Sequence, residues 1–175
     1  MKPQQRGGNN NRERRADKPV SEFKDQVLEV RRVSRVMAGG KRFTFRAAVV
    51  VGDYKGRVGL GIAKGLDFAS SVQKAKRQAE KDLIKVPLVN GRTIPHDVEA
   101  KFDAAWVRIK PAREGHGLIA GGSCRSVLEL AGVKDISAKI LSRTKNKIAN
   151  ARATLKALEI LNTTVRRVNL EIKQK

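Results

Sequence analysis

The residue types that could do chemistry in this chain fall into three groups: the histidines and cysteine, a glycine-rich segment, and a large excess of basic residues. His96 and His116 are the only two histidines, and Cys124 is the only cysteine. A structural zinc site needs about four convergent ligands, and these three residues do not have metal-ligand spacing. We therefore expect no metal, no cofactor and no catalytic residue, and we predict that the protein is not an enzyme.

The glycine-rich segment, residues 111–122, is a candidate anion site. It ends at two glycines before Ser123, which is expected to cap a helix. Backbone N–H groups at a helix N-terminus can bind a phosphate. The same glycines would equally allow close packing against another element or another protein, and both interpretations stay open. The residues concerned are Gly115, His116, Gly117, Gly121, Gly122 and Arg125.

Another glycine pattern, residues 59–65, resembles a dinucleotide-binding loop only superficially. Its last glycine comes one residue too late, and its first two lie inside an alternating strand. A dinucleotide loop must instead follow a parallel strand and open a helix. A small-molecule kinase would also need an acidic metal ligand near Gly121, where only Glu114 and Glu129 are at hand. No small-molecule substrate is expected.

Basic residues give the strongest functional signal. Lys and Arg total 38 against 17 acidic residues, for a formal net charge of +21. Such a charge points to a polyanionic partner, and nucleic acid is the leading candidate. A membrane would require a basic amphipathic helix with bulky apolar anchors, which we do not find. The residues predicted to bind RNA surround the predicted strand turns: Arg31, Arg32, Arg35, Lys41, Arg42, Lys55, Arg57 and Lys64.

Two absences in the sequence, of acidic residues near the first hairpin and of a base-stacking aromatic pair, indicate which kind of RNA the protein binds. From Arg31 to Arg46 there is no acidic residue. Basic strand tips backed by a rigid sheet suit double-stranded RNA, which proteins read through phosphates, 2′-hydroxyls and shape. We recognise no aromatic pair of the single-strand-binding type on a strand, so base stacking is expected to matter less.

The first elements that would position these residues form a β-β-β-α unit. Residues 27–36 predict a strand with one irregular step, and residues 43–51 alternate with a period of two. Residues 52–56 predict a hairpin turn. In the next strand, Gly59 and Gly61 share a face, which indicates that another backbone packs closely there. A helical apolar stripe then runs from Phe68 to Leu83 and ends before Pro87.

The second half predicts a further α+β unit. Residues 93–102 and 105–110 form a predicted hairpin, and a helix from Ser123 ends at Gly132. A strand over 136–140, a helix over 148–161 and a final strand at Val168, Leu170 and Ile172 complete the prediction. The expected organisation is α+β, with two small domains and flexible basic termini. Its parts are a disordered tail (1–20), two domains (21–88 and 89–162) and a C-terminal strand or tail (163–175).

Two long motifs resemble a known family. Residues 40–61, GKRFTFRAAVVVGDYKGRVGLG, closely resemble the signature of the bacterial small-subunit ribosomal protein S-five family. Residues 114–122, EGHGLIAGG, with Arg125 and residues 127–133, VLELAGV, look like the second-domain motif of that family. The triplet Arg152-Ala-Thr154 also matches. The resemblance covers roughly residues 23–161, and the single cysteine and missing secretory signal agree with a cytoplasmic protein.

This resemblance implies a structural role in translation. The N-terminal domain would be like a double-stranded-RNA-binding domain without its first helix. The C-terminal domain would share a β-α-β type fold with some kinases but lack their catalytic residues. Family members bind small-subunit ribosomal RNA, support subunit assembly, affect decoding accuracy, and lie near the messenger RNA path. They contact the S-four and S-eight family proteins, and residues 115–125 would face the S-four partner.

One departure from the family pattern concerns the last helix. The family usually has Asn-Pro before Ile148, whereas this chain has Asn146-Lys147, so we expect a looser helix start. The alternative function is a free double-stranded-RNA-binding module that acts off the ribosome.

Overall fold

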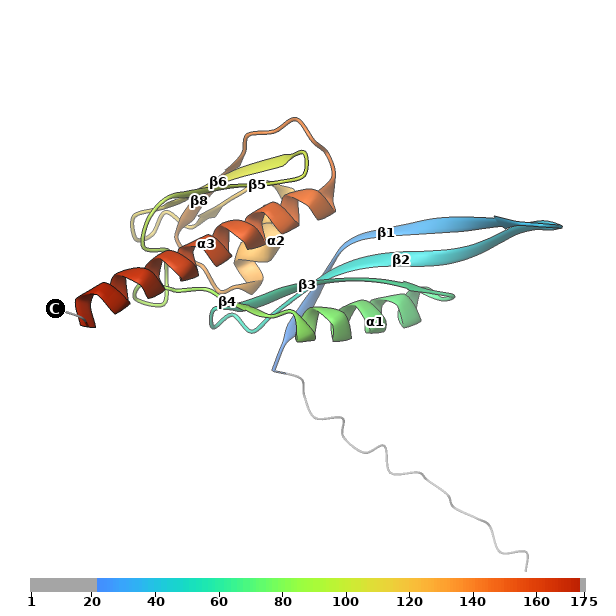
Figure 1. The fold of residues 1–175 in the computed structure, drawn as a ribbon, viewed down its shortest axis with the longest axis horizontal. Helices are drawn as coiled ribbons and strands as arrows, with labels where there is room; N and C mark the ends of the chain where they lie inside the picture. Colours follow the sequence, from blue (N-terminus) through green and yellow to red (C-terminus); the bar gives the residue numbers. More distant parts are fainter. Residues whose placement is uncertain (1–21, 174–175) are drawn as a thin grey trace, which may run out of the picture.

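The computed structural model describes residues 22–173, with side chains through residue 164. Within that range the fold is mixed α+β, with two four-stranded sheets and three helices (Figure 1). The first sheet has the strand order β1-β2-β3-β4 and the second has the order β5-β6-β8-β7. The predicted fold class is confirmed. The predicted domain boundaries stay a prediction.

The first sheet is antiparallel throughout. Its strands are β1 (Lys24–Met37), β2 (Gly40–Gly52), β3 (Arg57–Gly65) and the short β4 (Ile84–Lys85). A bulge between Val27 and Glu29 is the irregular step that the sequence predicts. Helix α1 (Phe68–Lys81) packs on one face of this sheet through Ala75 and Ala79.

Helix α1 approaches the sheet so closely that side chains are excluded. A Cβ atom on Gly61 would overlap the carbonyl oxygen of Ala75, and one on Gly59 would overlap that of Ala79. The close backbone approach predicted for these two glycines is therefore confirmed. The helix stripe differs from its prediction at the ends, since Phe68 is half exposed and the helix stops at Lys81. Beyond the helix end, Ile84 and Lys85 pair with Val58 and Arg57 as strand β4.

The second half places two helices between the two sheets (Figure 1). Strands β5 (Val98–Phe102) and β6 (Ala105–Pro111) form the predicted hairpin, with Asp103 in the left-handed region at φ 54°. Strand β8 (Ile136–Ile140) follows helix α2 (Gly122–Leu130), and helix α3 (Lys147–Lys173) ends the described chain. The apolar side chains of β5, β6 and β8 pack against α2 and α3 in one core, which also includes Val50 and Val58 of the first sheet.

The two halves are joined by backbone contacts at the end of α2. The β2–β3 turn donates hydrogen bonds from the N–H of Tyr54 to the carbonyl of Leu130 and from Gly56 to Ala131, both at 3.0 Å. These bonds satisfy carbonyls that a helix C-terminus leaves unpaired. Gly132 follows with φ 82°, and a Cβ there would overlap the carbonyl of Tyr54. The predicted helix stop at Gly132 therefore also forms the junction between the halves.

Several local predictions are corrected by the structure. Gly121, not Ser123, is the N-cap of α2, because the helix starts two residues earlier than predicted and Ser123 lies inside its first turn. The strand predicted from residue 93 begins at Val98. The glycine-rich segment contains a strand that the sequence did not predict, β7 (Leu118–Ile119), which pairs in parallel with β8.

The C-terminal strand predicted at Val168, Leu170 and Ile172 is wrong, because α3 continues through Lys173. Leu161, Val165, Val168 and Ile172 are four, three and four residues apart, which is helical spacing. No glycine or proline interrupts the chain between Ile148 and Ile172, so nothing ends the helix where the strand was expected. The tail predicted for residues 1–20 lies outside the described residues.

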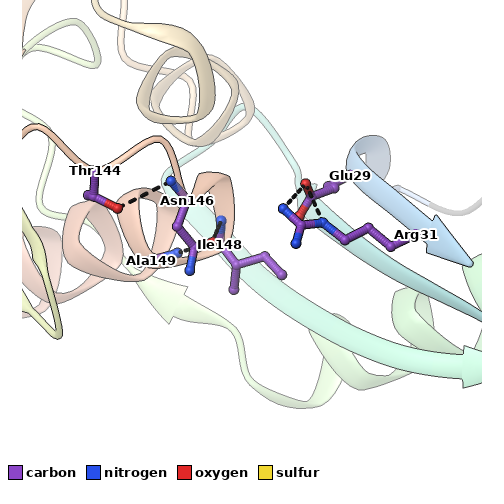
Figure 2. Close-up of polar contacts among 6 residues, drawn as sticks. All are labelled: Glu29, Arg31, Thr144, Asn146, Ile148 and Ala149. Carbon is purple, nitrogen blue, oxygen red and sulfur yellow. Dashed lines mark hydrogen bonds and ion pairs between the residues drawn. The ribbon is translucent and has the colours of Figure 1, made fainter. Parts of the chain in front are cut away.

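The start of α3 is well capped despite the lysine at position 147. The Asn146 side chain accepts hydrogen bonds from the N–H groups of Ile148 (3.1 Å) and Ala149 (3.4 Å), while Thr144 Oγ1 accepts from the N–H of Asn146 (Figure 2). An asparagine N-cap of this kind satisfies N–H groups that the helix leaves free. The looser start expected from the missing proline is therefore not observed.

Candidate nucleic-acid interface

Strands β1 and β2 form a two-stranded ribbon that projects from the body of the molecule (Figure 1). The two strands pair without interruption from Glu29 and Ala48 to Met37 and Gly40, at the tip. Side chains alternate between the two faces of such a ribbon, so the pairing register decides which basic residues lie together. The ribbon carries five of the eight residues predicted to bind RNA.

Basic residues from β1, β2 and the adjoining strand β3 lie on one face of the ribbon and of the sheet at its base. Arg31 is directly opposite Arg46, which is directly opposite Lys64 on β3, so three cations form one row across the sheet. Arg35 and Arg42 form a second row nearer the tip. We call these five residues the basic face. Four of them were predicted from the sequence, and Arg46 was missed because its alternation with Phe45 was read only as a strand pattern.

The basic face contains little internal neutralisation. Glu29 Oε1 accepts a hydrogen bond from Nε of Arg31 at 2.8 Å and forms an ion pair with its Nη2 at 2.7 Å (Figure 2). Within the part of the chain that the structure describes, no ion pair joins the other four basic-face residues to a carboxylate. Like charges directly opposite each other on neighbouring strands destabilise a sheet by about 0.2–1 kcal/mol per pair. An arrangement of this kind is stabilised when an external anion lies across the rows.

The opposite face of the ribbon differs in chemistry. Arg32 and Lys41, both predicted to bind RNA, point to this side together with Phe43 and Phe45. The guanidinium carbon of Arg32 lies 4.4 Å from the centre of the Phe43 ring. We call this side the aromatic face. Phe43 and Phe45, two residues apart, thus form an aromatic pair on one side of a strand, which was not predicted from the sequence.

The remaining two predicted residues, Lys55 and Arg57, lie at the other end of the sheet. Lys55 is exposed in the β2–β3 turn. Arg57 donates its Nε to Asp53 Oδ2 at 2.6 Å and also lies over the ring of Phe23. Burial raises the pKa of Asp53, but hydrogen bonds from the Arg57 side chain and from backbone N–H groups lower it by more. The pKa of Asp53 therefore lies below its usual value. Arg57 thus holds the turn in place through Asp53.

The glycine-rich segment is arranged around a carboxylate that the sequence analysis did not single out. Asp135 Oδ1 accepts hydrogen bonds from the N–H groups of Gly115 at 3.1 Å and Gly117 at 3.0 Å. Its Oδ2 accepts the Nε of Arg92 at 3.1 Å, and the side chain is only 4% exposed. Hydrogen bonding from Gly117 holds the pKa of Asp135 below its usual value, and the Arg92 charge acts in the same direction.

Asp135 therefore occupies the N–H groups of Gly115 and Gly117, whereas the helix N-terminus at Gly121 and Gly122, where the anion site was predicted, is not part of this contact. The N–H groups of Gly115 and Gly117 are thus paired within the chain and are not available to a phosphate. The sequence contains only a weak indication of this contact, namely an acidic residue, Asp135, directly before the strand at Ile136. Its partner Arg92 lies in the connection after β4, 43 residues away. The backbone of Arg92 accepts the N–H of Lys134 as well, at 2.8 Å, so the contact joins three segments.

The other predicted residues of this segment are more exposed. His116 and Arg125 are exposed, and Gly121 and Gly122 form the start of α2. A shallow pocket of about 380 Å³ lies between Leu118, Arg125, Glu129 and Tyr54 of the first half. The structure therefore separates the predicted group into two glycines closed by Asp135 and an open helix start beside Arg125.

Other kinds of site receive little support from the described residues. Between residues 22 and 173 there is no group of three or more His, Cys, Asp or Glu side chains able to hold a metal ion. No helix in this range is both long and apolar enough to cross a membrane. Cys124 is buried and its thiol lies 3.1 Å from the Thr154 hydroxyl; burial raises the pKa of the thiol. A raised pKa makes a thiol less reactive.

Comparison with known proteins agrees with this architecture. The family model for the N-terminal domain of ribosomal protein S5 matches residues 23–87, and the model for its C-terminal domain matches residues 100–170. The chain belongs to the ribosomal protein S5 family. The first range covers β1 to β4 with α1, and the second runs from within β5 to within α3.

Individual relatives in the ribosomal protein S5 family are identical to this chain at nearly half of the aligned residues. A small ribosomal subunit protein uS5 from Thermus thermophilus is 48% identical over 145 residues, which are 83% of this chain and 88% of the relative. A protein of the same name from Acaryochloris marina is 46% identical over 88% of this chain and 85% of the relative. One from Sulfurihydrogenibium is 48% identical over 79% of this chain and 71% of the relative. The predicted family resemblance is confirmed.

Proposed function

We propose that this protein is a structural component of the small ribosomal subunit that binds ribosomal RNA. In this role it acts in the cytoplasm, supports subunit assembly and contributes to decoding accuracy near the messenger RNA path. The proposal rests on membership of the ribosomal protein S5 family and on the basic face of the ribbon. It involves no catalysis and no cofactor.

The basic face is the single observation that carries this function. Three cations in one row, Arg31, Arg46 and Lys64, are spaced by strand pairing and not by flexible loops. Neighbouring strands lie about 4.8 Å apart, so the row is a preformed line of charge. Phosphates of an RNA helix would neutralise the row, and the cost of holding like charges together would then favour binding.

Binding of this kind releases counterions from the RNA. Each phosphate neutralised adds about 0.7–0.9 to the slope of log affinity against log salt concentration. Arg35 and Arg42 near the ribbon tip would extend the contact beyond the first row. Lys55 in the β2–β3 turn would contact RNA separately, because it lies at the opposite end of the sheet.

Neighbouring proteins would bind the second half. We propose that residues Gly115 to Arg125 contact a ribosomal protein of the S-four family and that an S-eight family protein also binds this chain. The glycine loop supports this proposal because Asp135 already binds the N–H groups of Gly115 and Gly117, which leaves the exposed outer side of the loop, including Ile119, for a protein surface. A nucleotide phosphate would have to displace a buried carboxylate to reach the N–H groups of Gly115 and Gly117.

Sedimentation through a sucrose gradient tests the proposal. The tagged protein should travel with small ribosomal subunits from a native lysate and stay bound after a wash at moderate salt. The double variant Arg35→Ala/Arg42→Ala should be released at lower salt, because two phosphate contacts are lost. Lys110→Ala/Lys139→Ala is the matched control, since it removes two exposed lysines from the second sheet.

The outcomes separate the alternatives. If the wild-type protein stays at the top of the gradient, the ribosomal role is wrong, and a free double-stranded-RNA-binding module becomes the better description. If both double variants dissociate alike, the ribbon is not the main RNA contact and general charge explains the binding.

A further inference from the structure

The aromatic face of the ribbon is an exposed apolar surface that the proposed phosphate contacts leave unexplained. Phe43 is 49% exposed and Val36 is 71% exposed, although both lie on a regular strand pair. Closer to the body, the same face of β2 continues as Ala47, Val49 and Val51, which helix α1 covers completely. Beyond α1 nothing within the described residues covers this face, so its apolar side chains are available to a partner.

The charges on the aromatic face indicate what the partner is. Arg32 and Lys41 are its ionisable residues, and no acidic residue occurs between Arg31 and Arg46. Arg32 lies over Phe43 at 4.4 Å, so a planar cation and an aromatic ring form one platform. Apolar protein surfaces would gain little from these cations. A nucleotide offers both a flat base for the platform and a phosphate for the cations.

We propose that the Arg32–Phe43 platform stacks an unpaired RNA base while the basic face holds phosphates of the same or a neighbouring RNA segment. The ribbon would then bind RNA on both sides, by stacking on one and by charge on the other. This inference rests on the proposed RNA-binding function. It changes the expectation from the sequence that base stacking matters little.

Substitution of Phe43 separates stacking from simple apolar contact. Phe43→Leu keeps an apolar side chain but removes the aromatic ring, whereas Phe43→Tyr keeps the ring. Loss of one base stack weakens binding by about 5- to 150-fold. Stacking releases no counterions, so the slope of log affinity against log salt should stay unchanged in Phe43→Leu. Removing a phosphate contact with Arg35→Ala should instead lower that slope by about 0.7–0.9.

The experiment titrates the full chain with two RNA probes of equal length at several potassium chloride concentrations. One probe is a hairpin whose loop carries 2-aminopurine at an unpaired position, and the other is a fully paired duplex. Wild type and Phe43→Tyr should quench the 2-aminopurine, while Phe43→Leu should bind the hairpin more weakly without quenching. Trp106→Leu is the control, because Trp106 is an equally exposed aromatic residue, 45%, on the outer face of the second sheet. Thermal unfolding of each variant checks that its fold is intact.

Each result decides the inference. The inference would be overturned if Phe43→Leu bound the hairpin and quenched the 2-aminopurine as well as wild type does. This would hold even if Phe43→Ala bound weakly, because a contact that leucine can replace is a general apolar contact and not a base stack. An equal loss for the duplex would overturn it as well, since paired bases are not free to stack. If Arg35→Ala also had no effect on affinity or slope, the proposed phosphate interface itself would be wrong.

Discussion

The ribbon and the glycine-rich loop both looked like anion sites in the sequence, but they differ in how much of each is open to a partner. In the loop, the chain supplies the anion itself, since Asp135 occupies the N–H groups of Gly115 and Gly117. On the ribbon, Arg31, Arg46 and Lys64 stand in one row, with Glu29 bound to Arg31 alone. The difference teaches that a basic or glycine-rich pattern identifies affinity for an anion without saying where the anion comes from.

The two regions also differ in what their charges do for stability. In the loop, opposite charges join three segments of the fold, and removing one leaves buried hydrogen-bonding groups unpaired. On the ribbon, like charges face each other, and removing one relieves repulsion. A functional charge site can therefore be recognised by substitutions that stabilise the protein while they weaken binding.

The largest effect is expected from breaking the junction that holds both regions on one body. Gly132→Ala places a side chain at φ 82° against the carbonyl of Tyr54. The strain and overpacking should lower the free energy of unfolding by about 2–5 kcal/mol, measured by urea denaturation. Gly91→Ala is the control for positive φ alone, because a Cβ at Gly91 would meet nothing. Equal losses in the two variants would show that the halves do not depend on this contact.

The next effect tests whether Asp135 fills the loop. Asp135→Ala removes the acceptor of two N–H groups, so the amide hydrogens of Gly115 and Gly117 should exchange much faster with solvent. Asp135→Asn keeps one oxygen acceptor and should retain most of the protection, although it loses the ion pair with Arg92. NMR-detected hydrogen exchange measures both. Unchanged exchange in Asp135→Ala would mean that the carboxylate does not order the loop.

Acid should weaken the loop in the same way. The pKa of Asp135 is lower in the folded protein than its ordinary value of 3.8, so the unfolded chain takes up the proton first as the pH falls. The stabilising contribution is complete above about pH 3.8 and is lost as the pH falls through the native pKa. The difference in free energy of unfolding between wild type and Asp135→Asn should therefore shrink on acidification. Asp53, whose pKa is also lowered, is present in both proteins, so its pH dependence does not contribute to this difference.

A smaller effect of opposite sign is expected on the ribbon. Arg42→Ala removes one partner of the Arg35–Arg42 pair and should stabilise the free protein by about 0.2–1 kcal/mol, while RNA affinity and its salt slope fall. Thermal unfolding and RNA titration measure the two quantities. A loss of stability would mean that Arg42 has a structural partner and that the contrast with the loop is false.

The smallest effect tests the open part of the glycine-rich segment. Arg125 is exposed in the first turn of α2, where the helix dipole disfavours a cation. Arg125→Ala should therefore leave stability unchanged or raise it by at most about 0.5 kcal/mol. Affinity for a purified S-four family protein, measured by calorimetry, should fall if this residue contacts the partner. An unchanged affinity would remove Arg125 from that interface.

Much of the fold could be predicted from local patterns. Neighbouring residues alone were enough to predict the period-two alternation of residues 43–51, the shared face of Gly59 and Gly61, and the helix stop at Gly132. The prediction of a final strand failed because Val168 and Ile172 fit two patterns: a period of two with Leu170, and a helical spacing with Leu161 and Val165. Local spacing cannot choose between two periods when no glycine or proline ends the preceding helix.

The sequence by itself determined the net charge, the family, the strand pattern and the presence of basic residues around the ribbon. Only the tertiary structure decided which of those residues share a face, because register pairs Arg31 with Arg46 and Lys64 while it turns Arg32 toward Phe43. It also decided that Asp135, far along the chain from Arg92, would close the loop. Charge and periodicity are properties of a chain in one dimension, whereas neutralisation depends on distances between segments that only folding brings together.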